Sequence, residues 1–169
     1  MGDGQEKREK TDMAGKEGFT LSLALVDALP VVFFAAAMIS FGARLNSGLF
    51  IAGAVLAVCG GAGKVTWKLM LALARKDVPW LAKQMRVTMP IGFVLIIAGC
   101  VASGQAFLAL SAGFAEPPSS VLMTVFFLCM LAMAWFAGHM DQSDARANWV
   151  EQLTNAAGQA CLLAAVLLA

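Results

Sequence analysis

Apolar residues occur along this chain in long, almost uninterrupted blocks, without the alternating or one-sided patterns of a water-soluble fold. A transmembrane helix needs about 20 consecutive, mostly apolar residues. The blocks therefore predict an all-α integral membrane protein with about five transmembrane helices in a single bundle. The predicted spans cover residues 19–43, 47–63 (continuing as helix to 76), 87–114, 119–138 and 149–169.

Prolines and small polar residues predict where the third and fourth helices begin and end. The third helix is expected to rise from Pro79, to be kinked at Pro90 and to end before Glu116-Pro117-Pro118. The residue before a proline is disfavoured in the helical conformation, which explains that end. Ser119 or Ser120 can then cap the fourth helix.

The fifth helix is the shortest apolar block. It is expected to begin near Asp141, yet it is continuously apolar only from Leu153. The remaining residues to Ala169 rise only about 25 Å, against a hydrocarbon core of about 30 Å. Its membrane passage must therefore begin near Trp149. A chain with four spans and a re-entrant C-terminus is the alternative.

Charge predicts the orientation in the membrane. With the N-terminus in the cytoplasm, all of the 12 Lys and Arg residues except Arg44 lie on the inner side, as the excess of basic residues in cytoplasmic loops requires. Residues 1–18 mix acids, bases and Gly, and are expected to form a disordered cytoplasmic tail. The hairpin between the second and third helices is expected to project into the cytoplasm. Tryptophan favours the membrane interface, and all four lie near the inner boundary: Trp67, Trp80, Trp135 and Trp149.

Composition agrees with this architecture and excludes several functions. The chain is 60% hydrophobic and 14% charged, against about 25% charged residues in soluble domains. A net charge of +1 offers no basis for nucleic-acid binding. The cysteines have no CxxC spacing, and a lone histidine is poor support for haem, so we expect no cofactor. The cysteines read as small buried hydrophobes: Cys59, Cys100, Cys129 and Cys161.

Asp27 is the most unusual residue of the predicted spans. It lies about eight residues into the first span, roughly 12 Å below the inner boundary. Ionisable residues in a membrane are costly and usually face the bundle interior or a wet cavity. Pro30 lacks an N–H and so frees the carbonyl of Val26 nearby. Asp27 is therefore either part of a proton, cation or headgroup site, or a structural carboxyl that is neutral or paired to a neighbouring helix.

A stripe of polar residues begins at the cytoplasmic end of the fifth helix and descends to about the depth of Asp27. Its members are three or four positions apart, so they share one helix face. Such residues can hydrogen-bond between helices, contributing about 0.6–2 kcal/mol each. Continuity favours a polar pathway or ligand site, whereas simple interhelical hydrogen bonding is the alternative. The stripe consists of Asp141, Asp144, Asn148, Glu151, Asn155 and Gln159.

The first two acids of the stripe follow the only histidine of the chain. His139, Asp141 and Asp144 offer nitrogen and oxygen ligands that could hold a divalent metal ion. Loops between spans often contain such residues, so the pattern is only a weak indication, and no metal site is predicted.

Basic residues form two stripes on the hairpin between the second and third helices. Juxtamembrane Lys and Arg attract anionic lipid headgroups with about 1 kcal/mol each. The stripes therefore predict contact with anionic inner-leaflet lipids or a phosphate, although setting the topology or docking onto the acidic stripe would also explain them. These residues are Lys64, Lys68, Arg75, Lys83 and Arg86.

Three functional hypotheses follow. The first is a transport or channel protein, or a transporter subunit, whose polar pathway opens to the cytoplasm in the cell membrane. Five spans are few for a solitary transporter, so a homo-oligomer or a partner membrane subunit is expected. The second is a membrane enzyme acting on a lipid or amphipathic phosphate at the inner leaflet, although no catalytic signature is visible. The third is a non-catalytic subunit or sensor that docks a cytoplasmic partner.

Overall fold

The computed structural model describes residues 21–74, 78–140 and 145–169, and all regular structure in these ranges is α-helical. Four helical segments are long and apolar enough to cross a membrane, namely Leu25–Leu45, Gly48–Ala74, Pro79–Ala102 and Ser119–His139. The expected tail at residues 1–18 and the expected start of the last helix near Asp141 lie outside the described residues. The helices are α2 (Leu21–Leu45), α3 (Gly48–Ala74), α4 (Pro79–Lys83), α5 (Met85–Ala102), α6 (Gly104–Gly113), α7 (Ser119–His139) and α8 (Ala145–Leu168).

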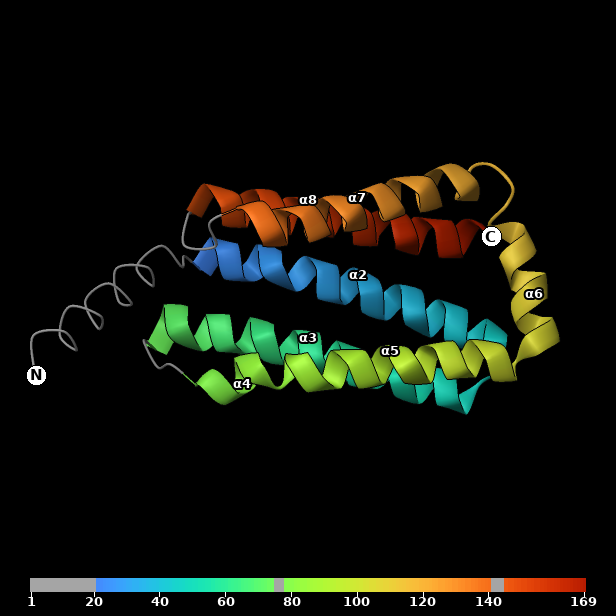
Figure 1. The fold of residues 1–169 in the computed structure, drawn as a ribbon, viewed down its shortest axis with the longest axis horizontal. Coiled ribbons are helices and arrows are strands. Elements are labelled where there is room, and N and C mark those ends of the chain that lie inside the picture. Colours follow the sequence, from blue (N-terminus) through green and yellow to red (C-terminus); the bar gives the residue numbers. More distant parts are fainter. Residues whose placement is uncertain (1–20, 75–77, 141–144) are drawn as a thin grey trace, which may run out of the picture.

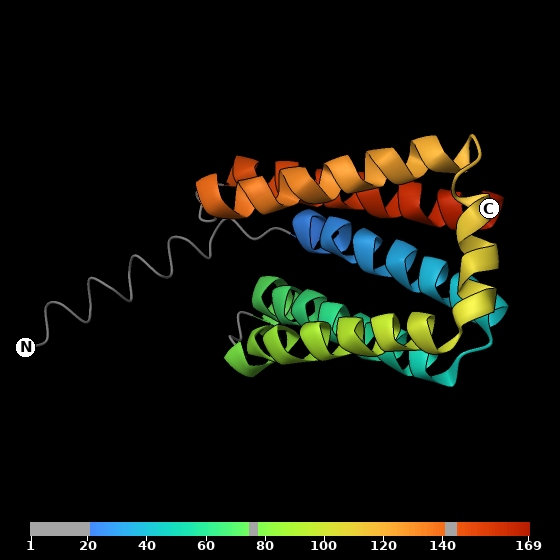
Figure 2. The same cartoon turned by 45° about the vertical axis from the view of Figure 1, so that its right-hand side comes forward.

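Helix α2 lies in the middle of the bundle, between two antiparallel helix pairs. It packs against α3 on one side and against α8 on the other, while α5 covers α3 and α7 covers α8 (Figures 1 and 2). A short turn at Asn46 and Ser47 joins α2 to α3, and Asn46 has a positive φ of 48°. Asparagine tolerates this left-handed conformation better than most residues do.

The α3–α5 pair is held at very short range by glycines that face each other. A Cβ atom added to Gly92 would lie 2.8 Å from the Gly53 carbonyl oxygen and 2.9 Å from the Ala57 nitrogen. One added to Gly53 would lie 2.6 Å from the Gly92 carbonyl oxygen. Small residues allow this close backbone approach, on which helix association in a membrane depends when burial from water offers no driving force.

The predicted third helix, which was expected to reach Phe114, is divided in the structure. Helix α5 ends at Ala102, and α6 begins at Gly104, which has a φ of +29°. Helix α6 then lies across the end of the bundle rather than along it (Figure 1). The 24 residues of Pro79–Ala102 already rise about 36 Å, enough to cross the hydrocarbon core. A crossing of the core therefore does not require the apolar residues of α6.

The α3–α4 hairpin ends close to the level at which α7 and α8 end, so it does not stand clear of the bundle as expected (Figures 1 and 2). Lys68 lies five residues beyond Gly63 and pairs with Asp27 of α2. Residues beyond Gly63 thus lie beside α2 instead of projecting away from it. The part of α3 that was expected outside the membrane is part of the bundle.

The opposite end of the bundle, where α6 lies, is closed by aromatic residues. Phe41 of α2 has its ring centroid 5.4 Å from that of Phe50, 6.4 Å from Phe107 and 5.9 Å from Phe114. Phe41 and Phe50 belong to the buried core together with Ala37, Leu45, Ala54, Leu162 and Val166. Side chains of α2, α3, α6 and α8 therefore fill this end with apolar atoms.

The glycine contact yields a stability prediction with a matched control. We expect Gly92→Ala to destabilise the protein by about 1–3 kcal/mol, because the added methyl group meets backbone atoms that cannot move independently. Gly138 is also helical but has nothing within 4 Å of an added Cβ. Gly138→Ala should leave stability unchanged or raise it by up to about 1 kcal/mol. Equal thermal unfolding temperatures for the two variants in detergent would contradict the role given to Gly92.

Candidate functional site

A buried ion pair joins α2 to α3. Lys68 Nζ lies 3.0 Å from Asp27 Oδ2, and the two side chains are only 4% and 6% exposed. The charges of Lys64 and of Glu151 on α8 also act on the Lys68 ammonium. Charged groups of α2, α3 and α8 thus interact with one another inside the bundle.

These charged groups lie at the same level along their helices. Asp27, Lys68 and Glu151 each lie six residues, or about 9 Å, from the end of the described part of α2, α3 and α8, respectively. All three helix ends lie at the end of the bundle opposite α6 (Figure 1).

The ion pair is costly to form and costly to break. Burying two charges requires removing their hydration, so a buried pair contributes little net stability compared with apolar residues of similar size. Removing one partner leaves an unpaired buried charge, which destabilises proteins by about 3–5 kcal/mol. The ion pair compensates the charge of Asp27 within the bundle, which corresponds to the structural alternative considered for this residue from the sequence.

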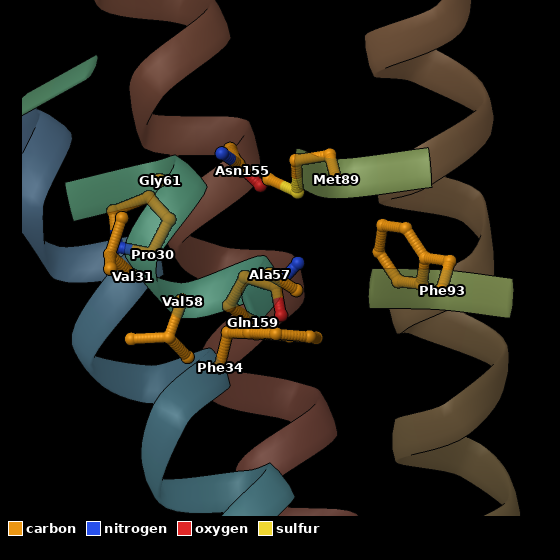
Figure 3. Close-up of a pocket in the computed structure, with 10 residues that line it drawn as sticks. All are labelled: Pro30, Val31, Phe34, Ala57, Val58, Gly61, Met89, Phe93, Asn155 and Gln159. Carbon is orange, nitrogen blue, oxygen red and sulfur yellow. The ribbon is translucent and has the colours of Figure 1, made fainter. Parts of the chain in front are cut away.

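Beyond the ion pair lies a partly open cavity of about 120 Å³ between α2, α3, α5 and α8. Figure 3 shows Asn155 and Gln159 directed from α8 toward this cavity. These two residues lie 10 and 14 residues from the start of α8, or about 15 and 21 Å along it. The cavity therefore occupies the middle depth of the bundle. Its other lining residues are Pro30, Val31, Phe34, Ala57, Val58, Gly61, Met89 and Phe93.

The Gln159 amide is only partly satisfied by the protein. Its Nε2 atom donates to the Met130 sulfur at 3.8 Å, which is a weak acceptor. Its Oε1 atom is buried and has no hydrogen-bond partner among the described residues, and the same holds for Oε1 of Gln152. A buried polar atom without a partner costs about 1–3 kcal/mol. The unused acceptor of Gln159 belongs to a residue that lines the cavity.

Aromatic contacts bound the cavity. The rings of Phe34 and Phe93 meet edge to face, with centroids 6.1 Å apart, and so connect α2 to α5 across the cavity. Farther along the bundle, the Phe41 cluster fills the space between the helices. Polar groups thus extend from one end of the bundle to its middle, whereas the Phe41 cluster toward the other end is apolar.

The structure divides the predicted basic residues into two groups. Lys68 faces the interior and pairs with Asp27, because α2 packs against this face of α3. Lys83 and Arg86 are exposed, and Lys64 is half-buried. Arg75 lies outside the described residues. The headgroup interpretation of Lys83 and Arg86 stays a prediction.

The predicted polar stripe is brought together with Asp27 in its lower part. Glu151 acts on the partner of Asp27, while Asn155 and Gln159 line the cavity with Pro30. Asn148, one turn above, is half-buried. The two acids at the start of the stripe, Asp141 and Asp144, lie outside the described residues.

His139 stands at the end of α7, in contact with its own helix. Its ring stacks on Trp135 with centroids 4.8 Å apart, and Nδ1 lies 2.9 Å from the Trp135 carbonyl oxygen, to which an Nδ1 hydrogen can donate. Within the described ranges, no three His, Cys, Asp or Glu side chains form a group that could hold a metal ion. The proposed partners of His139 are not part of those ranges.

Some residues of the site were not identified from the sequence. The partner of Asp27 is Lys68, which the sequence pattern had placed among the basic residues of the hairpin. The apolar lining residues Phe34, Met89 and Phe93 carry no signal in the sequence, because every span is apolar on all faces. Gln152, buried at 4% exposure, was also missed, although it adjoins Glu151 in the stripe.

No known protein family, curated protein or solved structure matches this chain.

The ion pair can be tested by a double-mutant cycle. We expect Lys68→Met and Asp27→Leu each to destabilise the protein by about 3–5 kcal/mol, and the double variant to be close to the unmodified protein or more stable. Unfolding in detergent, followed by circular dichroism, measures these free energies. Lys83→Met, which removes an exposed lysine, is the control and should change stability by less than about 0.5 kcal/mol. Additive effects of the two single changes would show that the pair is not coupled.

Proposed function

We propose that this chain is a small multi-pass membrane transport protein, or a subunit of one, with a polar pathway that opens to the cytoplasm. One observation carries the proposal. Polar and charged groups from α2, α3 and α8 gather at one end of the bundle and continue to a cavity at its middle depth. Ionisable residues inside a membrane generally line pathways or pair with one another, and here Asp27 and Lys68 form a pair.

The four charges that interact around Lys68 balance. Asp27 and Glu151 are acidic, while Lys64 and Lys68 are basic, so their formal charges cancel. This balanced group of charges disfavours selection for ions of one sign. The pathway therefore suits a neutral polar solute better than a single cation or anion, because fixed charge is what attracts an ion into a low-dielectric site.

The aromatic end of the bundle would act as the closed gate. The two helix pairs meet chiefly through α2, so a change in its packing would separate them. Transport then requires that the Phe41 cluster open while the Asp27 end closes, in the manner of alternating access. Assembly with further copies of this chain or with a partner subunit would complete the outer half of the pathway.

An enzyme acting on an amphipathic phosphate is the second candidate. Lys64, Lys83 and Arg86 belong to the same end of the bundle as Asp27 and Glu151, which would place a phosphate beside carboxylates at the inner leaflet. This arrangement requires no opening of the aromatic end. Flux across the membrane therefore discriminates between the two candidates.

The proposed orientation places the Asp27 end in the cytoplasm. In a variant without the native cysteines, we expect Gln105→Cys, on α6, to react with a membrane-impermeant maleimide in intact cells. Lys83→Cys, on α4, should react only after the membrane is permeabilised. Both residues are exposed, so burial does not bias the comparison. The reverse labelling pattern would place the polar end outside the cell.

Transport can be tested in proteoliposomes. Ion currents on a solid-supported membrane and stopped-flow swelling with glycerol, urea and acetamide together cover charged and neutral solutes. We expect swelling with at least one neutral solute, and about a tenfold slower rate for Asn155→Leu, because removing a polar group from the pathway costs about one hydrogen bond. Gln105→Leu, on the exposed face of α6, is the control. Absence of both swelling and current would contradict the proposal, as would equal rates for the two variants.

A further inference from the structure

The cavity at the middle of the bundle is lined by a side chain whose acceptor atom has no hydrogen-bond partner among the described residues. Gln159 Oε1 is a buried acceptor with no partner among the described residues, whereas its Nε2 already donates to Met130. A ligand that completes the site must therefore donate a hydrogen bond. The Asn155 amide, one turn away on the same face of α8, offers a second donor and acceptor pair.

The rest of the lining is apolar and partly aromatic. Phe34 and Phe93 contribute rings from α2 and α5, and Pro30 and Met89 lie nearby (Figure 3). Aromatic rings pack favourably against one another edge to face, as these two already do. A ligand with a flat, apolar body would therefore complement this side of the cavity.

Size and charge restrict the ligand further. The cavity measures about 120 Å³, and a protein cavity of about 150 Å³ holds a benzene molecule. None of the ten residues that line it is ionisable. An ion would lose its hydration there without gaining an opposite charge, whereas a neutral molecule would not.

We propose that this cavity binds a small neutral molecule of about the size of benzene, with an apolar body and a hydroxyl or amide group that donates to Gln159 Oε1. The apolar body packs against Phe34 and Phe93 from the side of the cavity, and Asn155 contacts the same polar group or its neighbour. This inference rests on the proposed function, since it names the class of solute that the pathway accepts.

The proposal is tested with 4-fluorophenol and 4-fluorotoluene, which differ in the hydroxyl group. The full chain is reconstituted in lipid nanodiscs, and binding is followed by ¹⁹F line broadening. We expect saturable binding of 4-fluorophenol at one site per chain, about tenfold tighter than binding of 4-fluorotoluene. Gln159→Leu should lower the affinity for 4-fluorophenol to that for 4-fluorotoluene. The control Gln105→Leu should change neither affinity. Equal affinities of the two probes, or full binding by Gln159→Leu, would overturn the proposal.

A second variant keeps the test valid if Gln159→Leu does not fold. Phe93 is 45% exposed, so Phe93→Leu leaves the buried core intact. This variant should bind both probes more weakly, and to a similar degree. Unchanged affinities in this variant would exclude the cavity as the binding site. Saturable, Gln159-dependent binding without flux would support this inference and count against transport. Flux that depends on Asn155, without Gln159-dependent binding, would overturn this inference and leave transport in place.

Discussion

The Asp27–Lys68 ion pair is the constraint to which the arrangement of the other helices is tied. Two buried charges at a distance of 3.0 Å fix both the rotation of α2 against α3 and the level at which they meet. A turn of either helix would leave a charge unpaired in a low-dielectric bundle, which is far more costly than a change in apolar packing. Because α2 also packs against α8, the same constraint brings Glu151, Asn155 and Gln159 to the interior.

The two ends of the bundle are held together by different forces. At the polar end, charges and amides interact across helices, and such interactions depend on exact partners. At the other end, Phe41 and its aromatic neighbours fill space without directional requirements, and α6 covers them. The cavity lies between the polar end of the bundle and the Phe41 cluster. Among the described residues, the charged groups next to it belong to the Asp27 end, so the two ends of the bundle differ in chemistry.

The sequence predicted part of the site and missed another part for identifiable reasons. Asp27 and the stripe through Gln159 stood out because polar residues are rare inside apolar blocks. Lys68 was grouped with the exposed basic residues, because the apolar run appeared to end at Gly63. The division of the third helix at Ser103 was also missed, since the residues on both sides of the bend are similarly apolar.

The sequence by itself determined that the chain is helical and rich in segments able to cross a membrane, because hydropathy and length are local properties. It also determined which polar residues must avoid lipid. Only the tertiary structure decided which helices are neighbours and that Lys68 forms an ion pair with Asp27. It also decided that four side chains from three helices line one cavity, namely Phe34, Phe93, Asn155 and Gln159. Helices that are apolar on every face carry no periodic signal for their partners. Their contacts are set by steric fit at glycines such as Gly53 and Gly92 and by a few buried polar groups, which act only once the helices meet.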